Sequence, residues 1–306
     1  MSENIPSLYT TQFSTNLEMK LQQHGSKLRG LVEEGSHVGK QASPVQQVGA
    51  IALKTPAGRF APKQRTDADF TRRWVFPKDG EIDQLIDSFD ELKTIVDPKS
   101  KYLTNAANAV GRGWDDEIIE KVHGTAQIGT DVDGLSSETW ASFSSAYDVA
   151  SDFKASAATG LTVAKLIEAK RILHHNHVDE DMDPITLVIG STQEADLLGQ
   201  TQVVSTEYND KPVLVDGKLK RFLGFNIVLS ERLNVASNVR DVIAFAKSGV
   251  YLGMWKDMTN RVSIRNDLSG EPYDLYTAVS YGATRTQPGK VLKILCSDTV
   301  GGDITV

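Results

Sequence analysis

The spacing of apolar residues near the amino terminus predicts first a helix and then a hairpin. Residues 16–34 carry four leucines and His24 at helical intervals, the pattern of a peripheral amphipathic helix. Residues 38–76 contain two β-prone pieces, VQQVGAIAL and FTRRWVF, with Pro and Gly residues between them. Alternating β-prone residues interrupted by such residues indicate strands joined by a turn. We therefore predict a helical arm followed by a β-hairpin with a long tip.

Two further helices are expected before residue 125. In residues 79–97, apolar side chains such as Ile82, Leu85 and Ile86 recur on one helical face, and seven acidic residues cover the rest. The next stretch, KYLTNAANAVGRGWDDEIIEKVHG, has apolar residues every three or four positions and ends at a glycine. This pattern predicts a long helix over about 101–123 that spans a domain.

The second half of the chain mixes helix and strand. Residues 125–160 show no clear period and are expected to form an irregular segment anchored by Trp140, Phe143 and Tyr147. Thr162 can cap a helix over TVAKLIEAKRILHH, which leads into the strand ITLVIGS and a short helix around QEADLLG. The last third reads mainly as strands separated by Asp-Gly and Pro-Gly breaks.

Composition narrows the class of protein. The chain has 33 Lys and Arg against 40 Asp and Glu, a formal charge of -7, which argues against a surface built to hold nucleic acid. Its single cysteine, Cys296, cannot form an internal disulfide, which fits a reducing compartment. Neither a signal peptide nor an uninterrupted apolar run of about 18 residues is present. We expect a soluble protein without a membrane segment.

Charge is distributed unevenly between the hairpin and the segment after it. In residues 54–73 six basic side chains outnumber two acidic ones, whereas residues 79–97 are strongly acidic. A solvated loop would account for an isolated basic run. A long hairpin with apolar flanks, next to an acidic segment, instead favours a partner on another copy of the chain.

No pattern in the sequence supports catalysis. His174, His175 and His177 stand beside Glu180 and Asp181 and are metal-binding residue types, but they crowd a helix end, where imidazoles cap the helix dipole. No complete phosphate-binding loop, calcium loop or nucleophile elbow occurs, and Cys296 reads as a small core residue. We therefore expect no catalytic, metal-binding or cofactor-binding residues and no cofactor.

The order of these parts resembles that of the major capsid proteins of tailed bacteriophages, the Hong Kong 97 fold family. The strongest local similarity lies in the long helix, where Arg112, Asp116, Glu117 and Gly124 resemble the family's arginine, acidic pair and terminal glycine. RFLGFNIVLSERL is similar to the family's run from an apolar loop into a strand, and YDLYTAVSYGATRTQPGKVLKI resembles its final sheet strands. The resemblance implies an α+β fold with an arm, an extended hairpin, a peripheral domain with a spine helix, and an axial domain. The implied boundaries are 1–37 for the arm, 38–76 for the hairpin, 77–160 for the peripheral domain with the spine helix at about 101–123, 161–245 for the axial domain, and 246–306 for return strands of the peripheral domain.

The resemblance also implies which residues lie between subunits. On the hairpin they are Lys54, Arg59, Phe60, Lys63 and Arg65. On the acidic helix of an adjacent chain they are Asp83, Asp87, Asp90 and Glu91. On the spine helix the residues of interest are Arg112, Trp114, Asp116 and Glu117. Ion pairs would set register and partner choice, while Ile51, Leu53 and Phe60 would supply adhesion.

The expected function is that of a structural, non-enzymatic major capsid protein. It would assemble through pentamers and hexamers into the icosahedral head of a tailed phage and enclose double-stranded DNA without sequence-specific binding. Portal and scaffolding proteins, and in some relatives a decoration protein, would be its partners, with assembly in the host bacterial cytoplasm and a final location in the virion. Two alternatives stay open: an encapsulin-type nanocompartment shell, and a metal-dependent enzyme using His174, His175 and His177.

Overall fold

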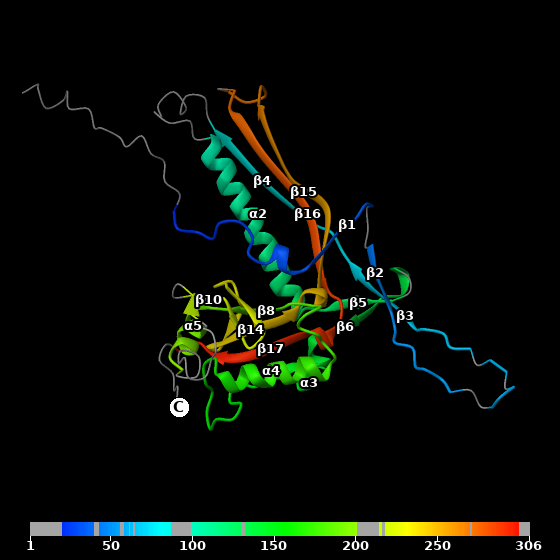
Figure 1. Ribbon diagram of the computed structural model, residues 1–306. Helices are drawn as coiled ribbons and strands as arrows, with labels where there is room; N and C mark the ends of the chain where they lie inside the picture. The colour runs from blue at the N-terminus through cyan, green and yellow to red at the C-terminus, as the bar shows by residue number, and fades with distance from the viewer. Residues whose placement is uncertain are drawn as a thin grey trace, which may run out of the picture.

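A computed structural model (Figure 1) describes residues 20–39, 43–55, 58–60, 62–63, 65–86, 99–129, 132–200, 214–215, 218–269 and 271–299. Two units built on separate sheets stack on one another, and a hairpin projects away from both. Short helical turns connect the main elements: η2 (Arg29–Leu31), η3 (Val132–Gly134), η4 (Trp140–Ser142), α3 (Ser144–Tyr147), η5 (Lys247–Gly249) and η6 (Pro288–Lys290). Within the described residues, no helix combines the length and hydropathy that a membrane crossing requires.

The first unit is a four-stranded sheet with a long helix along one face. The strand order is β1-β15-β16-β4, with β1 (Glu33–Ser36), β4 (Lys78–Ile86), β15 (Val250–Ile264) and β16 (Tyr273–Arg285). β1 runs parallel to β15, and the other neighbours are antiparallel. Helix α2 (Lys99–Val122) lies along the sheet, and its Val110, Trp114 and Ile118 share a buried cluster with Val279 and Tyr281 of β16. This burial of one helical stripe holds α2 on the sheet.

The second unit is a seven-stranded sheet covered by two helices. Its order is β11-β12-β8-β14-β17-β7, with β13 beside β14. The strands are β7 (Asp148–Val149), β8 (Ile185–Ile189), β11 (Arg221–Phe222), β12 (Phe225–Leu229), β13 (Val235–Ala236), β14 (Val239–Ala246) and β17 (Val291–Ser297). Helices α4 (Val163–His175) and α5 (Ser191–Leu198) belong to this unit, and Leu166 and Leu173 of α4 share a core cluster with Leu187 and Ile294. The backbone N–H of Lys165 donates to Thr162 Oγ1 at 3.3 Å, so Thr162 caps α4 as expected.

The hairpin is rooted in a third, smaller sheet. Its order is β2-β3-β5-β6, with β2 (Ser43–Val48), β3 (Phe70–Val75), β5 (Ala126–Ile128) and β6 (Ser136–Glu138). Strands β2 and β3 pair antiparallel, which confirms the predicted hairpin. A separate two-stranded ribbon joins β9 (Leu214–Val215) to β10 (Lys218–Leu219).

The long helix predicted at about 101–123 is confirmed by α2, and the predicted helix–strand–helix passage after Thr162 is confirmed by α4, β8 and α5. The segment at 125–160 contains only short elements, and its anchor Trp140 is buried beside Phe143 and Tyr147. Residues 246–306 were expected to form return strands of the peripheral domain. In the structure they divide between two sheets, because β15 and β16 lie in the four-stranded sheet whereas β17 pairs with β14 in the seven-stranded sheet.

The prediction of an acidic helix over residues 79–97 is wrong for residues 79–86. Residues 78–86 form strand β4, which pairs with β16 at nine positions from Lys78 to Ile86. Ile82 and Ile86 fit a helical and a strand period equally well, but Leu85, which the helix would bury, is half exposed. The open edge of β16 decides between the two periods, since pairing satisfies the backbone of the whole segment. The remaining residues, 87–97, lie outside the described part of the chain.

The prediction of a helix over residues 16–34 of the arm is also wrong for residues 20–34, which the structure describes. From residue 20 onward the arm contains only the turn η2 and then strand β1. Gly25 adopts a left-handed φ of 64°, and the backbone N–H groups of Lys27 and Leu28 donate to the Asp115 carboxylate on α2. A helical arm would use those N–H groups internally, so binding to α2 replaces helix formation.

Candidate functional site

The tip of the hairpin exposes both cations and large apolar side chains. Leu53 and Phe60 are 101% and 94% exposed, and Val48, Ile51 and Phe70 are also exposed. The predicted contact residues Lys54, Arg59, Lys63 and Arg65 all lie on the surface of the same segment. Lys54 Nζ donates to the Arg65 carbonyl at 2.9 Å, and Arg65 pairs with Asp67 at 2.8 Å. Apolar surface concentrated on a projecting hairpin is typical of an interaction site.

An unpaired column of carboxylates follows the edge strand β4. Asp79, Glu81 and Asp83 alternate along this strand and are exposed, while the residues between them face α2. Tyr276 Oη donates to Glu81 at 3.2 Å, and none of the three carboxylates forms an ion pair with a described cation. Burial and the nearby Asp83 carboxylate raise the pKa of Asp274 on β16. Arg265 is close enough to Asp83 to interact with it electrostatically, but within the described residues the column forms no ion pair and lies on the edge strand of its sheet.

This column contains one of the four predicted acidic contact residues, Asp83, although on a strand rather than a helix. The other three, Asp87, Asp90 and Glu91, lie outside the described residues. Asp79 and Glu81, which the sequence pattern had placed on the same acidic helix, join Asp83 because alternate residues of a strand share one face.

The spine-helix residues make contacts within their own chain. Arg112 donates to Gln22 Oε1 at 2.7 Å and to the Gln23 carbonyl at 3.2 Å. Asp116 pairs with Arg232. Glu117 is buried and pairs with Lys78 at 2.7 Å. These residues fasten the arm, β4 and the neighbouring loop to α2.

Trp114 is buried in the α2 cluster, and the Arg29 guanidinium lies 4.3 Å from the centre of its ring. This contact brings a cation of the arm onto the helix, a favourable cation–π arrangement.

Asp115, which the sequence pattern did not single out, is the strongest attachment point of the arm. Its carboxylate is fully buried and accepts hydrogen bonds from two backbone N–H groups at 3.0 and 3.1 Å and from the side chains of Gln23 and Ser26. Asn108 Oδ1 accepts from the Gly25 N–H at 3.0 Å. The signal in the sequence is a glycine and polar residues at helical spacing, 108, 111, 112 and 115, on one side of the long helix.

The root of the hairpin contains three charged side chains from three strands. Arg73 of β3 donates to both carboxylate oxygens of Glu138 on β6, one of them at 3.2 Å. Arg285, at the end of β16, lies 3.7 Å from the same carboxylate and donates to the Val122 and Gly124 carbonyls at the end of α2. All three side chains are largely buried.

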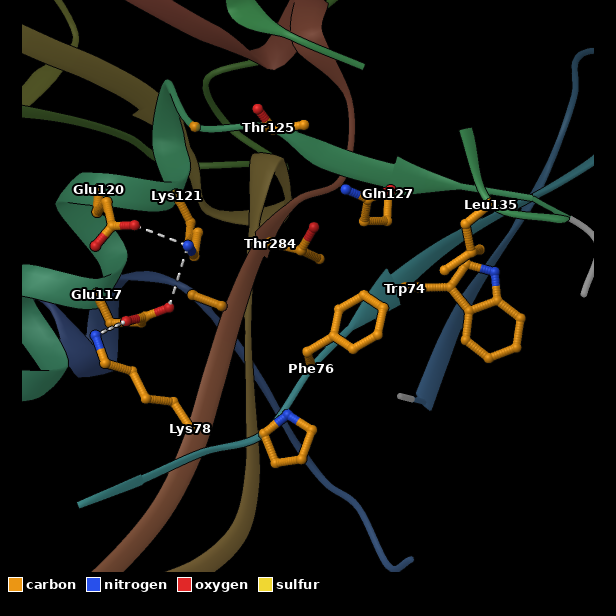
Figure 2. A pocket seen from close by; sticks show the side chains of 13 residues that line it. Trp74, Phe76, Lys78, Glu117, Glu120, Lys121, Thr125, Gln127, Leu135 and Thr284 are labelled. Carbon is orange, nitrogen blue, oxygen red and sulfur yellow. Dashed lines mark hydrogen bonds and ion pairs between the residues drawn. The ribbon is translucent and has the colours of Figure 1, made fainter. Parts of the chain in front are cut away.

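A cleft of about 850 Å³ opens beside this root, between β3, β5, β16 and the end of α2. Figure 2 shows Trp74 and Phe76 on one side of the cleft and a chain of ion pairs, Lys78–Glu117–Lys121–Glu120, on the other. Each charge in this chain has a partner, and the cleft contains no nucleophile paired with a base. Nothing in its lining supports a reaction.

The histidines proposed as a metal site do not form one. His174 Nε2 and Lys170 Nζ both contact Glu180 Oε1, at 2.7 and 2.6 Å. Among the described residues, no group of three or more His, Cys, Asp or Glu side chains is arranged to hold a metal ion. Cys296 is fully buried, and burial raises the pKa of its thiol to about 12, which keeps it unreactive at neutral pH.

Comparison with known proteins shows which solved structures share this architecture. The structure is similar to the capsid subunit of cyanophage P-SCSP1u, with a TM-score of 0.75, 13% identity, and coverage of 98% of this chain and 96% of that one. It is similar to the capsid of cyanophage Pam1 (TM-score 0.72, 12% identity, 96% and 98% coverage) and to Mycobacterium phage Che8 (0.68, 15%, 96% and 98%). No curated protein sequence matches the chain.

These similarities identify the fold as the Hong Kong 97 type shared by phage capsid subunits. The sequence model of the phage capsid protein family matches residues 5–298. The chain therefore belongs to the phage capsid protein family, and the expected function as a major capsid protein of a tailed phage is confirmed. Its role is structural, it is a component of the virion, and the encapsulin and metal-enzyme alternatives are not favoured.

Proposed function

We propose that copies of this chain assemble through pentamers and hexamers into an icosahedral shell, with the hairpin of one copy lying against strand β4 of the next. The observation that carries this proposal is a pair of complementary surfaces in one chain. The hairpin tip has cations with no ion-pair partner among the described residues, such as Arg59 and Lys63, and β4 has a column of carboxylates that likewise form no ion pair with a described cation. The cations lie on the tip of the projecting hairpin, whereas the carboxylates lie on the edge of a sheet. We therefore assign the two surfaces of one contact to different copies.

Apolar and charged groups would contribute differently to this contact. Burying a side chain the size of Leu53 or Phe60 contributes about 1.5–3 kcal/mol, whereas an exposed ion pair contributes about 0–1 kcal/mol. The charges therefore fix register and partner, and the apolar residues supply adhesion. A contact between two different surfaces is heterologous, and repetition of such a contact generates closed rings when the rotation closes.

The shell would enclose double-stranded DNA without sequence-specific binding and would require a portal and a separate scaffolding protein, with assembly in the host bacterial cytoplasm. A net charge of -7 supports this reading, because a strongly basic wall would bind the phosphates it must release.

A charge-swap experiment tests the hairpin contact. Arg59→Glu, Lys63→Glu and Arg65→Glu together should abolish shells and capsomers in sedimentation and electron microscopy, while the circular dichroism spectrum stays unchanged. The matched control reverses three exposed cations away from the hairpin, Lys220, Arg221 and Lys247, and should assemble normally.

The reciprocal change gives the decisive result. Adding Asp79→Lys, Glu81→Lys and Asp83→Lys to the hairpin variant restores opposite charges and should recover assembly. Normal shells from the hairpin variant alone, or no recovery by the combined variant in the presence of scaffold, would remove the hairpin–β4 contact from the proposal.

A further inference from the structure

The hairpin is joined to the body by few backbone contacts. Strand β3 pairs with β5 at only two positions, Arg73 with Ile128 and Trp74 with Gln127. Side-chain hydrogen bonds add to this, among them those from Trp74 Nε1 to the Gly129 carbonyl at 2.9 Å and from Gln47 to the Thr286 carbonyl at 3.1 Å. The hairpin projects far beyond this root (Figure 1). A small rotation at the root therefore moves the tip through a large distance.

Charged groups at the root are not balanced. Arg285 is fully buried and Arg73 nearly so, and among the described residues Glu138 is the only carboxylate that pairs with either guanidinium. Both arginine Nε atoms are buried without a hydrogen-bond partner in the described structure. Two cations thus share one anion in a buried site, where like charges repel more strongly than in water.

The position of Glu138 lets it connect the hairpin to the body. Its carboxylate receives Arg73 from the hairpin strand, and both its carboxylate and its backbone carbonyl, at 3.3 Å, face Arg285. Arg285 in turn holds the end of α2 through two carbonyls and lies 5.2 Å from the Trp140 ring centre. A series of side-chain contacts therefore connects the hairpin, through Glu138 and Arg285, to the end of the spine helix.

We propose that Glu138 is a positioning residue that fixes the direction of the hairpin, by binding Arg73 and Arg285 at the same carboxylate. This inference rests on the proposed function, because direction matters only if the hairpin must reach a surface on another copy. Burial of the shared site supports it: desolvation lowers the pKa of Arg285, and the positive charge of Arg73 lowers it further. Without Glu138, two buried cations repel across the root and the hairpin loses its single orientation.

The direction of the hairpin can be measured in the unassembled full-length chain. Spin labels at Ala52→Cys near the hairpin tip and His175→Cys on α4 both occupy exposed positions, and the buried Cys296 does not label. The parent should give one narrow distance distribution, and Glu138→Gln should broaden it. The control Asp267→Asn removes another bidentate arginine partner, that of Arg265 at 2.7 and 2.8 Å, and should leave the distribution narrow. A narrow, unshifted distance in Glu138→Gln would overturn the inference.

A second variant separates positioning from loss of stability. Arg73→Met in the Glu138→Gln background removes the repelling cation and should narrow the distribution again, whereas continued broadening would refute the repulsion mechanism. If Glu138→Gln does not fold, Glu138→Asp keeps the charge one methylene further back and should give a narrow but shifted distance. An unshifted distance in Glu138→Asp would contradict the proposal that the position of the Glu138 carboxylate determines the direction of the hairpin.

These distances do not depend on assembly. If the hairpin charge reversal leaves shells intact, the proposed contact fails while the spin-label result still decides whether Glu138 orients the hairpin.

Discussion

The partly buried histidine just after α2, His123, should make the stability of the subunit depend on pH. The His123 ring lies 4.6 Å from the Trp140 ring, and its Nε2 is 3.4 Å from the Leu292 carbonyl. Burial is the main cause that lowers its pKa from 6.5 to about 3, and the positive charges of Lys293 and Arg285 lower it further. The folded protein therefore keeps this ring neutral throughout the range from pH 7 to pH 5.

The sign of the effect follows from the two protonation states. In the unfolded chain the ring has its ordinary pKa of about 6.5 and binds a proton below that pH, while the folded state does not. A depressed histidine pKa thus contributes stability that is present above about pH 6.5 and is lost as the pH falls toward 3. At pH 5 the loss is RT ln(1 + 10^1.5), or about 2 kcal/mol, and at pH 7 it is about 0.2 kcal/mol.

His123→Phe tests this magnitude, because phenylalanine keeps an aromatic ring against Trp140 but cannot be protonated. Reversible urea denaturation of the unassembled chain at pH 7 and pH 5 gives the free energy of unfolding for parent and variant. Every other titrating group is common to both, so the parent should lose about 2 kcal/mol more than the variant between the two pH values. Equal losses would refute the reasoning, as would an NMR titration of the His123 ring with a midpoint near 6.5.

Three further results are expected. Gly111→Ala should release the arm and speed its proteolysis, because the added methyl would lie about 2.5 Å from the arm backbone, whereas Gly113→Ala meets only a tyrosine hydroxyl at 3.0 Å and should keep the arm protected. Asp115→Asn should destabilise the arm by about 2–4 kcal/mol in hydrogen exchange, since two or more charge-assisted hydrogen bonds weaken or are lost; unchanged protection of residues 23–28 would contradict this. Cys296 should resist a thiol reagent in the native chain and react on unfolding, and rapid native labelling would contradict its burial.

Each element could be predicted from the sequence where its apolar pattern fitted only one type of secondary structure, and not where the pattern fitted both helix and strand. The stripe of α2 fits a helix only, and the sequence located that helix to within about two residues at each end. Residues 79–86 fit both periods, and the free edge of β16, more than 180 positions away in the sequence, selected the strand. Long-range pairing of this kind leaves no local signal.

The arm shows a second limit. Its leucines have helical spacing, yet the groups that determine its conformation are Asn108, Gly111 and Asp115 on another element. The basic hairpin tip was predictable because charge and exposure are local properties. The root was not, because Arg73, Glu138 and Arg285 come from three strands and their meeting depends on the complete fold.

The proposed contact of the hairpin with a second copy would explain the contrast between tip and root. An exposed tip with Leu53 and Phe60 in water adds nothing to the stability of a single subunit and becomes favourable only when a second copy covers it. Its orientation must therefore be fixed before the partner arrives, and apolar packing, which has no direction, specifies orientation less sharply than a shared carboxylate does. A buried charge group contributes little net stability but penalises every geometry that leaves it unpaired. In the proposed role, placing that group at the root rather than the tip would let one residue, Glu138, restrict the whole projecting element, while the tip would stay free to match its partner.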